Sequence, residues 1–448
     1  MQKRILISID HKWRDLPGYI YLGKLLEKHS FKVEYCRSGL EKFYIQGFKP
    51  HIVVVNHLLD KSRQKYFNEV ASWGVRVVIL PTEGIPTLAK YREFAAGVES
   101  DLSSVSLHFL WNEPMKDVTN KNKTILSDKL KVVGVPRFDF YKEPLNVILI
   151  SKKDFIKKYK LKENLPIITF ATNYTQAQFT SQNQEFLKED GKNLGYDKFY
   201  EEIKGEDSVP EKDYKSREIS IKAFIKLIEE LENVNFILKL HPSEEHTYYF
   251  ELLENELRDY KDRVVVIVQE YIWDILAVTD IELKRSCTTG IESWILGHPT
   301  IEMKLNQDEW YYSPEHVVGS DIVTTYNELK ETVLEYLRGK QISKAKQEMR
   351  KDFLNTWCYK VDGKSTMRTV DELVNLDLED LTVKLNAKEL VIYFLLKYGN
   401  NKIHDIRVYG FWSLFGSRNI DKLGRIDKYF HKNNITDWSL KLKDFNNT

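Results

Sequence analysis

The sequence predicts an α/β protein with two doubly wound, Rossmann-like domains facing a cleft, followed by a mostly helical C-terminal extension. Strand-like apolar runs alternate with helix-like segments, which is typical of βαβ units and a parallel sheet. This alternation occurs twice, on either side of a Lys-rich stretch at 151–164. The length of 448 residues also exceeds what one ordinary hydrophobic core holds together. We therefore expect domains at 1–150 and 151–340 and an extension at 341–448.

The first series of elements starts with an apolar strand at Arg4–Ile9. Apolar residues at helical spacing then predict a helix over Tyr19–His29. Four further strands are expected, at Lys32–Tyr35, Ile52–Val55, Val75–Leu80 and Lys131–Val133.

The second series starts with the strand Pro166–Ala171, and a polar insertion at 175–215 is expected to form loops or irregular helices. The helix Ile219–Leu231 carries its apolar residues on one face. Gly297 ends the helix Gly290–Leu296. The remaining predicted elements are the strands Phe236–Leu240, Arg263–Val268 and one around Ile281, and helices from Glu245 and over Ile272–Ala277.

Helices are also predicted near and within the extension. Asn327 is expected to cap a helix that runs to Arg338, and Ser365 or Thr366 to cap one that runs to Val374. The tail at 381–448 carries twelve Lys and Arg against six Asp and Glu, a net charge of +6. The tail is therefore the basic part of the chain.

Composition excludes several classes of protein. Lys and Arg (67) nearly balance Asp and Glu (66), which argues against a general nucleic-acid binder. The three cysteines are far apart and form no C-x-x-C pair, which fits a reducing cytoplasm and offers no zinc site. The longest apolar run, Leu390–Leu396, is far shorter than the roughly 20 residues that span a bilayer. We expect a cytoplasmic protein without a metal ion, cofactor or transmembrane segment.

Two strand ends in the second series carry polar loops. Phe236–Leu240 runs into His241 and Pro242, and the later loop at 285–289 runs straight into a helix. Ligands of open α/β sheets bind at the carboxyl ends of strands. A hydroxyl-rich turn that feeds a helix N-terminus offers N–H donors and a positive dipole end, which suit a phosphate. The pair therefore predicts a nucleotide or sugar-nucleotide site.

Each residue of that site has a functional and a structural interpretation. His241 could donate to a phosphate or base, or only satisfy its turn, and Pro242 stiffens that turn. Gly290 would let a ligand approach the backbone. Glu292 could bind ribose hydroxyls or only favour the helix N-terminus. The hydroxyls expected to hold a phosphate are those of Ser286, Thr288 and Thr289, of which either threonine could instead be a simple cap.

The first series offers a candidate catalytic residue, Glu83. It follows the strand Val75–Leu80 in a loop fixed by two prolines, where it could act as a general base or support a developing cation at a sugar carbon. The alternative is an ordinary loop glutamate. Other strand ends carry weaker candidates for acceptor binding, which could instead be capping groups: Asp10, His11, Asn56 and His57.

These motifs resemble a known group of proteins. The order of Lys239–Pro242, Asp274–Asp280, Cys287–Ser293 and Leu296–Pro299 resembles the nucleotide domain of GT-B glycosyltransferases. It is more closely similar to bacterial surface-carbohydrate biosynthesis proteins related to capsule Kdo transferases and, more distantly, to CDP-glycerol glycerophosphotransferases. The resemblance covers roughly residues 1–375.

The resemblance implies a CMP- or CDP-activated donor, with the His-Pro pair on the cytidine nucleotide and the Ser/Thr-rich loop on its phosphate. Gly134–Asp139 looks like the Gly-x-Pro-Arg-x-Asp segment that such proteins carry near the interdomain crossing. Thr82–Gly84 is similar to the acidic Glu-Asp-Gly motif of the capsule Kdo transferases, with Glu83 in the place of the acid before glycine.

We therefore expect a metal-independent glycosyltransferase of bacterial surface polysaccharide assembly. It would move a 3-deoxy-ulosonic acid, of the Kdo or nonulosonic type, from a CMP donor to a glycan or lipid-linked glycan. Three alternatives stay open: transfer of a polyol phosphate from a CDP donor, sugar-nucleotide epimerisation, and a nonenzymatic nucleotide-sugar binding module.

The basic tail contains two apolar-aromatic pieces, Leu390–Leu396 and Tyr409–Phe415. Each Lys or Arg near an anionic membrane surface contributes about 1 kcal/mol of binding, so the tail could hold the protein at the inner membrane. The alternative is that these pieces pack across the two domains or form a homodimer contact.

Overall fold

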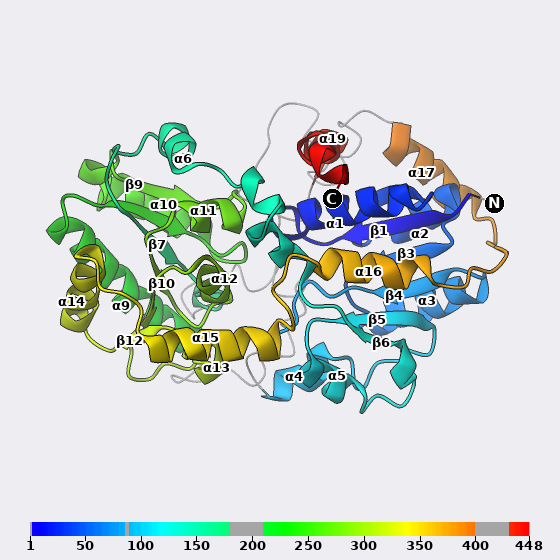
Figure 1. Ribbon diagram of the computed structural model, residues 1–448, viewed down its shortest axis with the longest axis horizontal. Coiled ribbons are helices and arrows are strands. Elements are labelled where there is room, and N and C mark those ends of the chain that lie inside the picture. Colours follow the sequence, from blue (N-terminus) through cyan, green and yellow to red (C-terminus); the bar gives the residue numbers. More distant parts are fainter. Residues whose placement is uncertain (1, 86–88, 180–208, 399–429, 448) are drawn as a thin grey trace. The chain divides into compact units, whose positions relative to one another are not determined.

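The computed structural model describes residues 2–85, 89–179, 209–398 and 430–447. The chain divides into two compact units (Figure 1). The first unit comprises Met1–Ile148 and Asp352–Thr448, and the second comprises Leu149–Lys351. Each unit is built on one six-stranded sheet. The predicted fold class, two doubly wound parallel-sheet domains with a helical C-terminal region, is confirmed.

The sheet of the first unit has the order β2-β1-β3-β4-β5-β6, and neighbouring strands are parallel. The chain places β2 on one side of β1 and β3 on the other, so the topological switch point lies between β1 and β3. Such a point is where open sheets bind ligands. The strands are β1 (Arg4–Ile9), β2 (Lys32–Arg37), β3 (Ile52–Val55), β4 (Arg76–Ile79), β5 (Val105–Leu110) and β6 (Leu130–Val132).

The sheet of the second unit has the order β12-β11-β10-β7-β8-β9, again all parallel. Counted from β7, this is the Rossmann order 3-2-1-4-5-6, with the switch point between β7 and β10. The strands are β7 (Ile167–Ala171), β8 (Asn235–Lys239), β9 (Val264–Ile267), β10 (Ile281–Lys284), β11 (Thr300–Met303) and β12 (Asp321–Val323).

Apolar helix faces cover both sheets. In the second unit, Phe224 packs between Phe170 of β7 and Phe236 of β8, with ring centroids 5.3 and 5.6 Å away. Helices of the first unit are α1 (Lys12–Lys28), α2 (Glu41–Phe48), α3 (Lys61–Ser72), α4 (Ala89–Ala95) and α5 (Glu113–Thr119). Those of the second are α6 (Lys152–Tyr159), α9 (Val209–Glu230), α10 (His246–Asn255), α11 (Ile272–Val278), α12 (Thr289–Leu296), α13 (Pro314–Val317) and α14 (Tyr326–Leu337).

The described part of the C-terminal region packs into the first unit. Helix α17 (Ala387–Tyr398) lies on α2 (Figure 1). Tyr393 of α17 meets Tyr44 of α2 edge to face, with ring centroids 5.5 Å apart. Helix α19 (Lys432–Lys441) lies on α1 and its Trp438 packs against Phe140. Two more helices, α15 (Lys344–Trp357) and α16 (Ser365–Val374), precede them. The piece Tyr409–Phe415 lies outside the described residues.

Two predicted helix caps are wrong. The hydroxyl of Thr325, not Asn327, accepts the first free N–H of α14, from Glu328 at 3.2 Å. Helix α16 is capped by neither Ser365 nor Thr366: their backbone N–H groups donate to the carboxylate of Asp139, at 3.0 and 2.7 Å. The carboxylate of Asp139, which is distant in sequence, caps α16 in place of a side chain next to the helix.

Candidate functional site

The loop after β8 holds His241 in a defined tautomer. The backbone N–H of Ser243 donates to Nδ1 of His241 at 3.1 Å, and the N–H of His241 donates to Oγ1 of Thr172 at 3.1 Å. Because Nδ1 accepts a hydrogen bond, a neutral ring carries its proton on Nε2. With Pro242 next in the half-buried turn, the loop sets His241 up as a hydrogen-bond donor.

Glu244, which sequence reasoning did not single out, fastens this loop to the one after β7. Its carboxylate accepts from the backbone N–H of Tyr174 at 2.7 Å and from the hydroxyl of Tyr249. Burial raises the pKa of Glu244 to about 7. In the sequence, a Glu pair just before a helix looks like ordinary first-turn charge. Nothing in the sequence therefore indicates that Glu244 is buried and connects two loops.

In the loop after β10, Ser286 is buried and makes its hydrogen bonds within the protein. Its backbone is in the left-handed region (φ 41°), and its N–H donates to both oxygens of Glu302, at 2.7 and 2.9 Å. Its hydroxyl donates to Glu302 Oε1 at 3.1 Å and accepts from the N–H of Ser313 at 3.2 Å. With 1% of its surface exposed, Ser286 shapes the loop that leads to Thr288 and Thr289.

The Lys284 side chain occupies the space that a side chain of residue 290 would need. A Cβ at Gly290 would lie 2.3 Å from both Cδ and Cε of Lys284. The Lys284 ammonium is itself buried against Glu302 at 3.0 Å. The glycine is thus required by packing. Thr288 and Thr289 do begin α12, and Glu292 lies in its first turn with 3% of its surface exposed.

A buried arginine lies directly before this loop. Arg285 pairs with Asp213 at 2.6 Å and with Glu309, and its guanidinium lies 4.6 Å from the ring centroid of Tyr174. Burial alone would lower the pKa of Arg285, but the two carboxylates outweigh burial and raise it. Sequence reasoning missed Arg285, because its acidic partners lie far away along the chain.

Loops of three adjacent strands of the second unit therefore surround its switch point. The loops after β8 and β10 lie on either side of β7, about 10 Å apart at a strand spacing of roughly 4.8 Å. The structure brings the predicted His241 loop and the Thr288–Thr289 helix start to one edge of one sheet.

In the first unit, Arg14 joins two of the predicted residues. It donates to Asp10 at 3.5 Å and to Glu83 at 2.6 Å, and also to Oγ1 of Thr82 at 2.8 Å. It donates to both oxygens of Asp15 as well. Burial alone would lower the pKa of Arg14, but Asp15, Glu83 and Asp10 outweigh it and raise the pKa. The Glu83 side chain stays 75% exposed.

The other predicted acceptor residues make local contacts at the same sheet edge. Nδ1 of His11 accepts from the N–H of Trp13 at 3.1 Å and so caps α1. Oδ1 of Asn56 accepts from the N–H of His57 at 3.0 Å. These positions flank the switch point between β1 and β3. The His11 bond is of the capping kind that the sequence left open, whereas Asn56 bonds to the residue next to it and caps no helix.

Comparisons with known proteins identify the fold. No protein-family model matches the sequence, and no curated protein matches it. A variant of the wall teichoic acid polymerase TagF, in a structure with CDPG, has a TM-score of 0.53 at 14% identity, over 84% of this chain and 88% of that one. The UDP-GlcNAc 2-epimerase from Neisseria meningitidis bound to UDP-GlcNAc has a TM-score of 0.51 at 14% identity, over 83% and 100%. Another UDP-N-acetylglucosamine 2-epimerase has a TM-score of 0.52 at 14% identity, over 86% and 100%.

The protein has a GT-B fold. Sequence identities this low establish the architecture, and the roles of single residues have to come from the geometry of this chain.

The segment Gly134–Asp139 has a structural role within the first unit of this GT-B fold. Gly134 has φ 85°, and a Cβ there would lie 2.7 Å from the Ser365 hydroxyl. Arg137 donates to the carbonyl oxygen of Thr82 at 2.8 Å and stacks on Trp111 at 4.7 Å. Asp139 caps α16, and burial raises its pKa to about 6. The motif thus ties α16 and the Thr82–Glu83 loop to the sheet.

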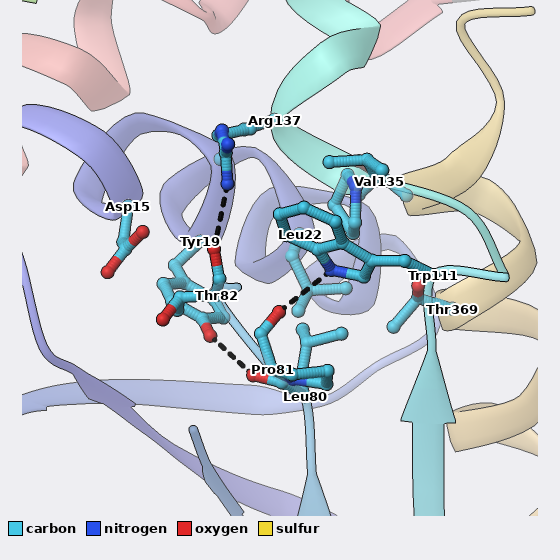
Figure 2. A pocket seen from close by; sticks show the side chains of 13 residues that line it. Asp15, Tyr19, Leu22, Leu80, Pro81, Thr82, Trp111, Val135, Arg137 and Thr369 are labelled. Carbon is cyan, nitrogen blue, oxygen red and sulfur yellow. Dashed lines mark hydrogen bonds between the residues drawn. The ribbon is translucent and has the colours of Figure 1, made fainter. Parts of the chain in front are cut away.

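A pocket opens beside this loop (Figure 2). It encloses about 400 Å³ of space that includes open solvent. Figure 2 shows Asp15 and Arg137 on the left of the view and Val135 and Trp111 on the right. The pocket therefore has a polar and an apolar side.

Over the described ranges, no three His, Cys, Asp or Glu side chains gather in a way that could hold a metal ion. Among the same residues, no helix is both long and apolar enough to cross a membrane.

Proposed function

We propose that this GT-B protein is a transferase of surface-glycan assembly that takes a cytidine-activated donor. The leading form is transfer of a 3-deoxy-ulosonic acid, of the Kdo or nonulosonic type, from a CMP donor to a glycan or lipid-linked glycan. The observation that carries the proposal is the placement of His241, as an Nε2 donor, at the same sheet edge as the start of α12.

In this proposal the second unit holds the nucleotide. His241 donates to the phosphate or to the base, while Thr288, Thr289 and the α12 N-terminus stabilise the phosphate. These groups become more effective as the sugar–phosphate bond breaks and negative charge grows on the departing CMP. Neutral donors and a helix dipole take the part that a metal ion plays in other transferases.

The first unit supplies the carboxylate. Arg14 lies 2.6 Å from Glu83, and a neighbouring cation favours the ionised form of a carboxylate. An ionised Glu83 can accept the proton of the acceptor hydroxyl as that hydroxyl attacks the sugar carbon, or it can support the developing cation there. Both roles require the charged form that Arg14 favours.

Two other enzymatic functions have structural neighbours in their favour. The TagF structure with CDPG supports a CDP donor that carries a polyol phosphate, and the UDP-GlcNAc complex of the epimerase supports a UDP-sugar without an acceptor. A thermal-shift panel of CMP, CDP, UDP, GDP and dTDP separates them. We expect CMP to give the largest shift, whereas preference for CDP or UDP would favour the corresponding alternative.

A nonenzymatic nucleotide-sugar binding module is the remaining alternative. It predicts nucleotide binding without turnover for every donor offered. Hydrolysis or transfer from a CMP-ulosonic acid, followed as released CMP with and without a glycan acceptor, decides between this alternative and the transferase.

The exposed side of α17 supports a contact with the inner membrane surface as part of the same proposal. Val391, Phe394, Leu395 and Tyr398 are between 47% and 72% exposed there, and the sequence of residues 381–448 carries a net charge of +6. A lipid-linked acceptor would then lie near the enzyme.

A further inference from the structure

The pocket of the first unit has a glycine where an alanine would fit. Gly18 lines the pocket from α1. Among the residues that the structure describes, the atom nearest to a Cβ at Gly18 would be Cα of Arg137, at 3.9 Å. Glycine in a helix interior costs about 1 kcal/mol relative to alanine. The fold therefore carries a cost at Gly18 that packing does not explain.

A second glycine of the same helix shows the contrast. At Gly23 a Cβ would lie 2.0 Å from the hydroxyl oxygen of Tyr35, so packing alone forbids a side chain there. At Gly18, as far as the described residues go, a Cβ would reach only van der Waals distance from the Arg137 backbone, so a small side chain there would mainly take up room in the pocket. This difference indicates that the room is kept for a ligand.

The apolar side of the pocket is small and well buried. Leu22, Leu80, Val135 and the rings of Tyr19 and Trp111 line it, and each is buried. The aromatic polar atoms are already bonded inside the protein: the Tyr19 hydroxyl donates to the carbonyl oxygen of Leu80 and the Trp111 indole N–H to that of Pro81, both at 3.0 Å (Figure 2). This side therefore favours a small apolar group such as a methyl.

The polar side offers both a hydrogen-bond acceptor and a donor. The Asp15 carboxylate accepts from the N–H of His11 and from two nitrogens of Arg14, and an ionised carboxylate has about four lone-pair positions. Arg137 lines the same side, and its guanidinium carries five N–H donors. A group with one N–H, one carbonyl oxygen and one methyl matches this pocket.

We propose that this pocket binds the acetamido group of an N-acetylated amino sugar. The methyl lies on the apolar side, the amide N–H donates to Asp15, and the carbonyl oxygen accepts from Arg137. A phosphate fits less well, because Asp15 would repel it. A plain hydroxyl would leave the apolar side unfilled, and a long acyl chain would cover Asp15 and Arg137 while offering neither of them a hydrogen bond.

The pocket is connected to the Glu83 cluster. Thr82 lines the pocket, and its hydroxyl accepts from Arg14, which binds Glu83. A sugar held here by its acetamido group lies beside Glu83. That this sugar is the acceptor rests on the proposed function, but the binding itself does not.

The experiment compares matched sugars by saturation-transfer NMR on the full chain. N-acetylglucosamine, N-acetylgalactosamine and N-acetylmannosamine are each titrated against the parent hexose. We expect binding of one or more N-acetyl sugars about tenfold tighter than its parent, with the strongest saturation on the acetyl methyl. Equal binding of every pair, or saturation centred on the ring protons, would overturn the proposal.

Substitutions at Gly18 give the second arm. Gly18→Ala should keep or raise the melting temperature and weaken binding of the N-acetyl sugar severalfold. Gly18→Leu should abolish binding of that sugar. Unchanged sugar binding in a folded Gly18→Leu protein would overturn the proposal. If Gly18→Leu does not fold, an unchanged affinity of Gly18→Ala for the N-acetyl sugar would likewise overturn the proposal. CMP binding, read in the same samples, reports on the proposed function separately.

Discussion

Nη1 of Arg14 lies 2.6 Å from Oε1 of Glu83, and this ion pair joins the first turn of α1 to the loop after β4. The same guanidinium also binds Asp10 and Asp15. Its position means that the exposed Glu83 is held at the sheet edge by a fixed partner. An isolated loop glutamate would have no such constraint.

Replacing Glu83 should separate binding from turnover. Glu83→Gln keeps the shape but removes the charge, so we expect unchanged CMP affinity and a loss of about 10²–10⁴-fold in kcat. Glu93→Gln is a matched control, because Glu93 is also an exposed glutamate of the first unit in an ion pair, with Lys121 at 2.7 Å. Near-normal kcat in Glu83→Gln would show that Glu83 is a loop residue and would favour the binding module.

Arg14 should matter through its geometry and not only through its charge. Arg14→Lys keeps one cation but cannot bind Glu83 and both oxygens of Asp15 at once, so we expect kcat to fall about tenfold with a smaller effect on KM. Arg63→Lys is the control. Arg63 has the same 21% exposure and pairs with Glu41 at 3.1 Å. Equal kcat values for the two variants would contradict a positioning role for Arg14.

His241 should contribute directly to nucleotide binding. Hydrogen bonds to charged groups contribute about 1.5–3 kcal/mol, so His241→Ala should weaken CMP binding roughly ten- to a hundredfold by calorimetry. EDTA should leave both binding and turnover unchanged. His29→Ala, an exposed histidine of the first unit, should bind CMP normally. Activity that requires Mg²⁺ or Mn²⁺, or wild-type affinity in His241→Ala, would rule out this assignment.

Glu244 should make stability depend on pH. Burial raises its pKa from 4.5 to about 7 in the folded protein, so folding favours the protonated form. Its contribution to the free energy of unfolding is full below pH 4.5 and is lost as pH rises through 7. Glu244→Gln copies the protonated form, since an amide can accept from the Tyr174 N–H and donate to the Tyr249 hydroxyl oxygen.

Denaturant unfolding at pH 5, 6, 7 and 8 measures this effect. We expect the free energy of unfolding of the wild type to fall, relative to that of Glu244→Gln, by on the order of 1–3 kcal/mol across the series. Parallel pH profiles for the two proteins would show that Glu244 does not titrate there. The neighbouring charge of Asp213 acts in the same direction as burial on Glu244, and it is present in both proteins.

The sequence predicted strands well where apolar runs are uninterrupted. Ile52–Val55 was placed with its observed bounds. Strand β11 was missed because Glu302 interrupts its pattern, and only the fold shows that Lys284 neutralises this buried carboxylate. Strand β5 was missed as well. Tyr174 and Asp213, which both contact Arg285, are likewise brought together only by the fold.

The candidate site shows the same limit. Strand-end residues such as Glu83 and His241 could be proposed from order alone, because parallel strands place their carboxyl ends at one edge of a sheet. Arg14 could not, since an arginine in a first helical turn looks like any solvated charge. The surroundings of Ser286 and Gly290 could not be predicted for a related reason. Their neighbours Glu302 and Lys284 lie on strands β11 and β10, and nothing in the sequence indicates that these two charged side chains are buried.

The exposed side of α17 should bind anionic membranes. The opposite side of the helix is packed, with Tyr393 and Leu396 buried on the first unit, so a truncation near Asp380 would remove core residues and is expected to destabilise the fold. Substitution at the exposed Phe394 and Leu395 avoids this problem. Full-length protein should sediment with anionic vesicles in low salt and be released in high salt, because each Lys or Arg near the surface contributes about 1 kcal/mol.

The double substitution Phe394→Ser and Leu395→Ser should abolish most vesicle binding and leave the melting temperature and CMP binding unchanged. Each large apolar side chain that is buried on binding contributes about 1.5–3 kcal/mol, so losing two should weaken binding by at least a hundredfold. Leu126→Ser is the control, because Leu126 is an exposed apolar residue of the same unit at 65% exposure. Vesicle binding that survives the double substitution would remove α17 from the membrane contact. Absence of vesicle binding in the wild type would rule out the membrane contact itself. The apolar face of α17 would then be assigned to a contact with a second copy of the chain. Sedimentation equilibrium would detect this contact as a dimer that the double substitution dissociates.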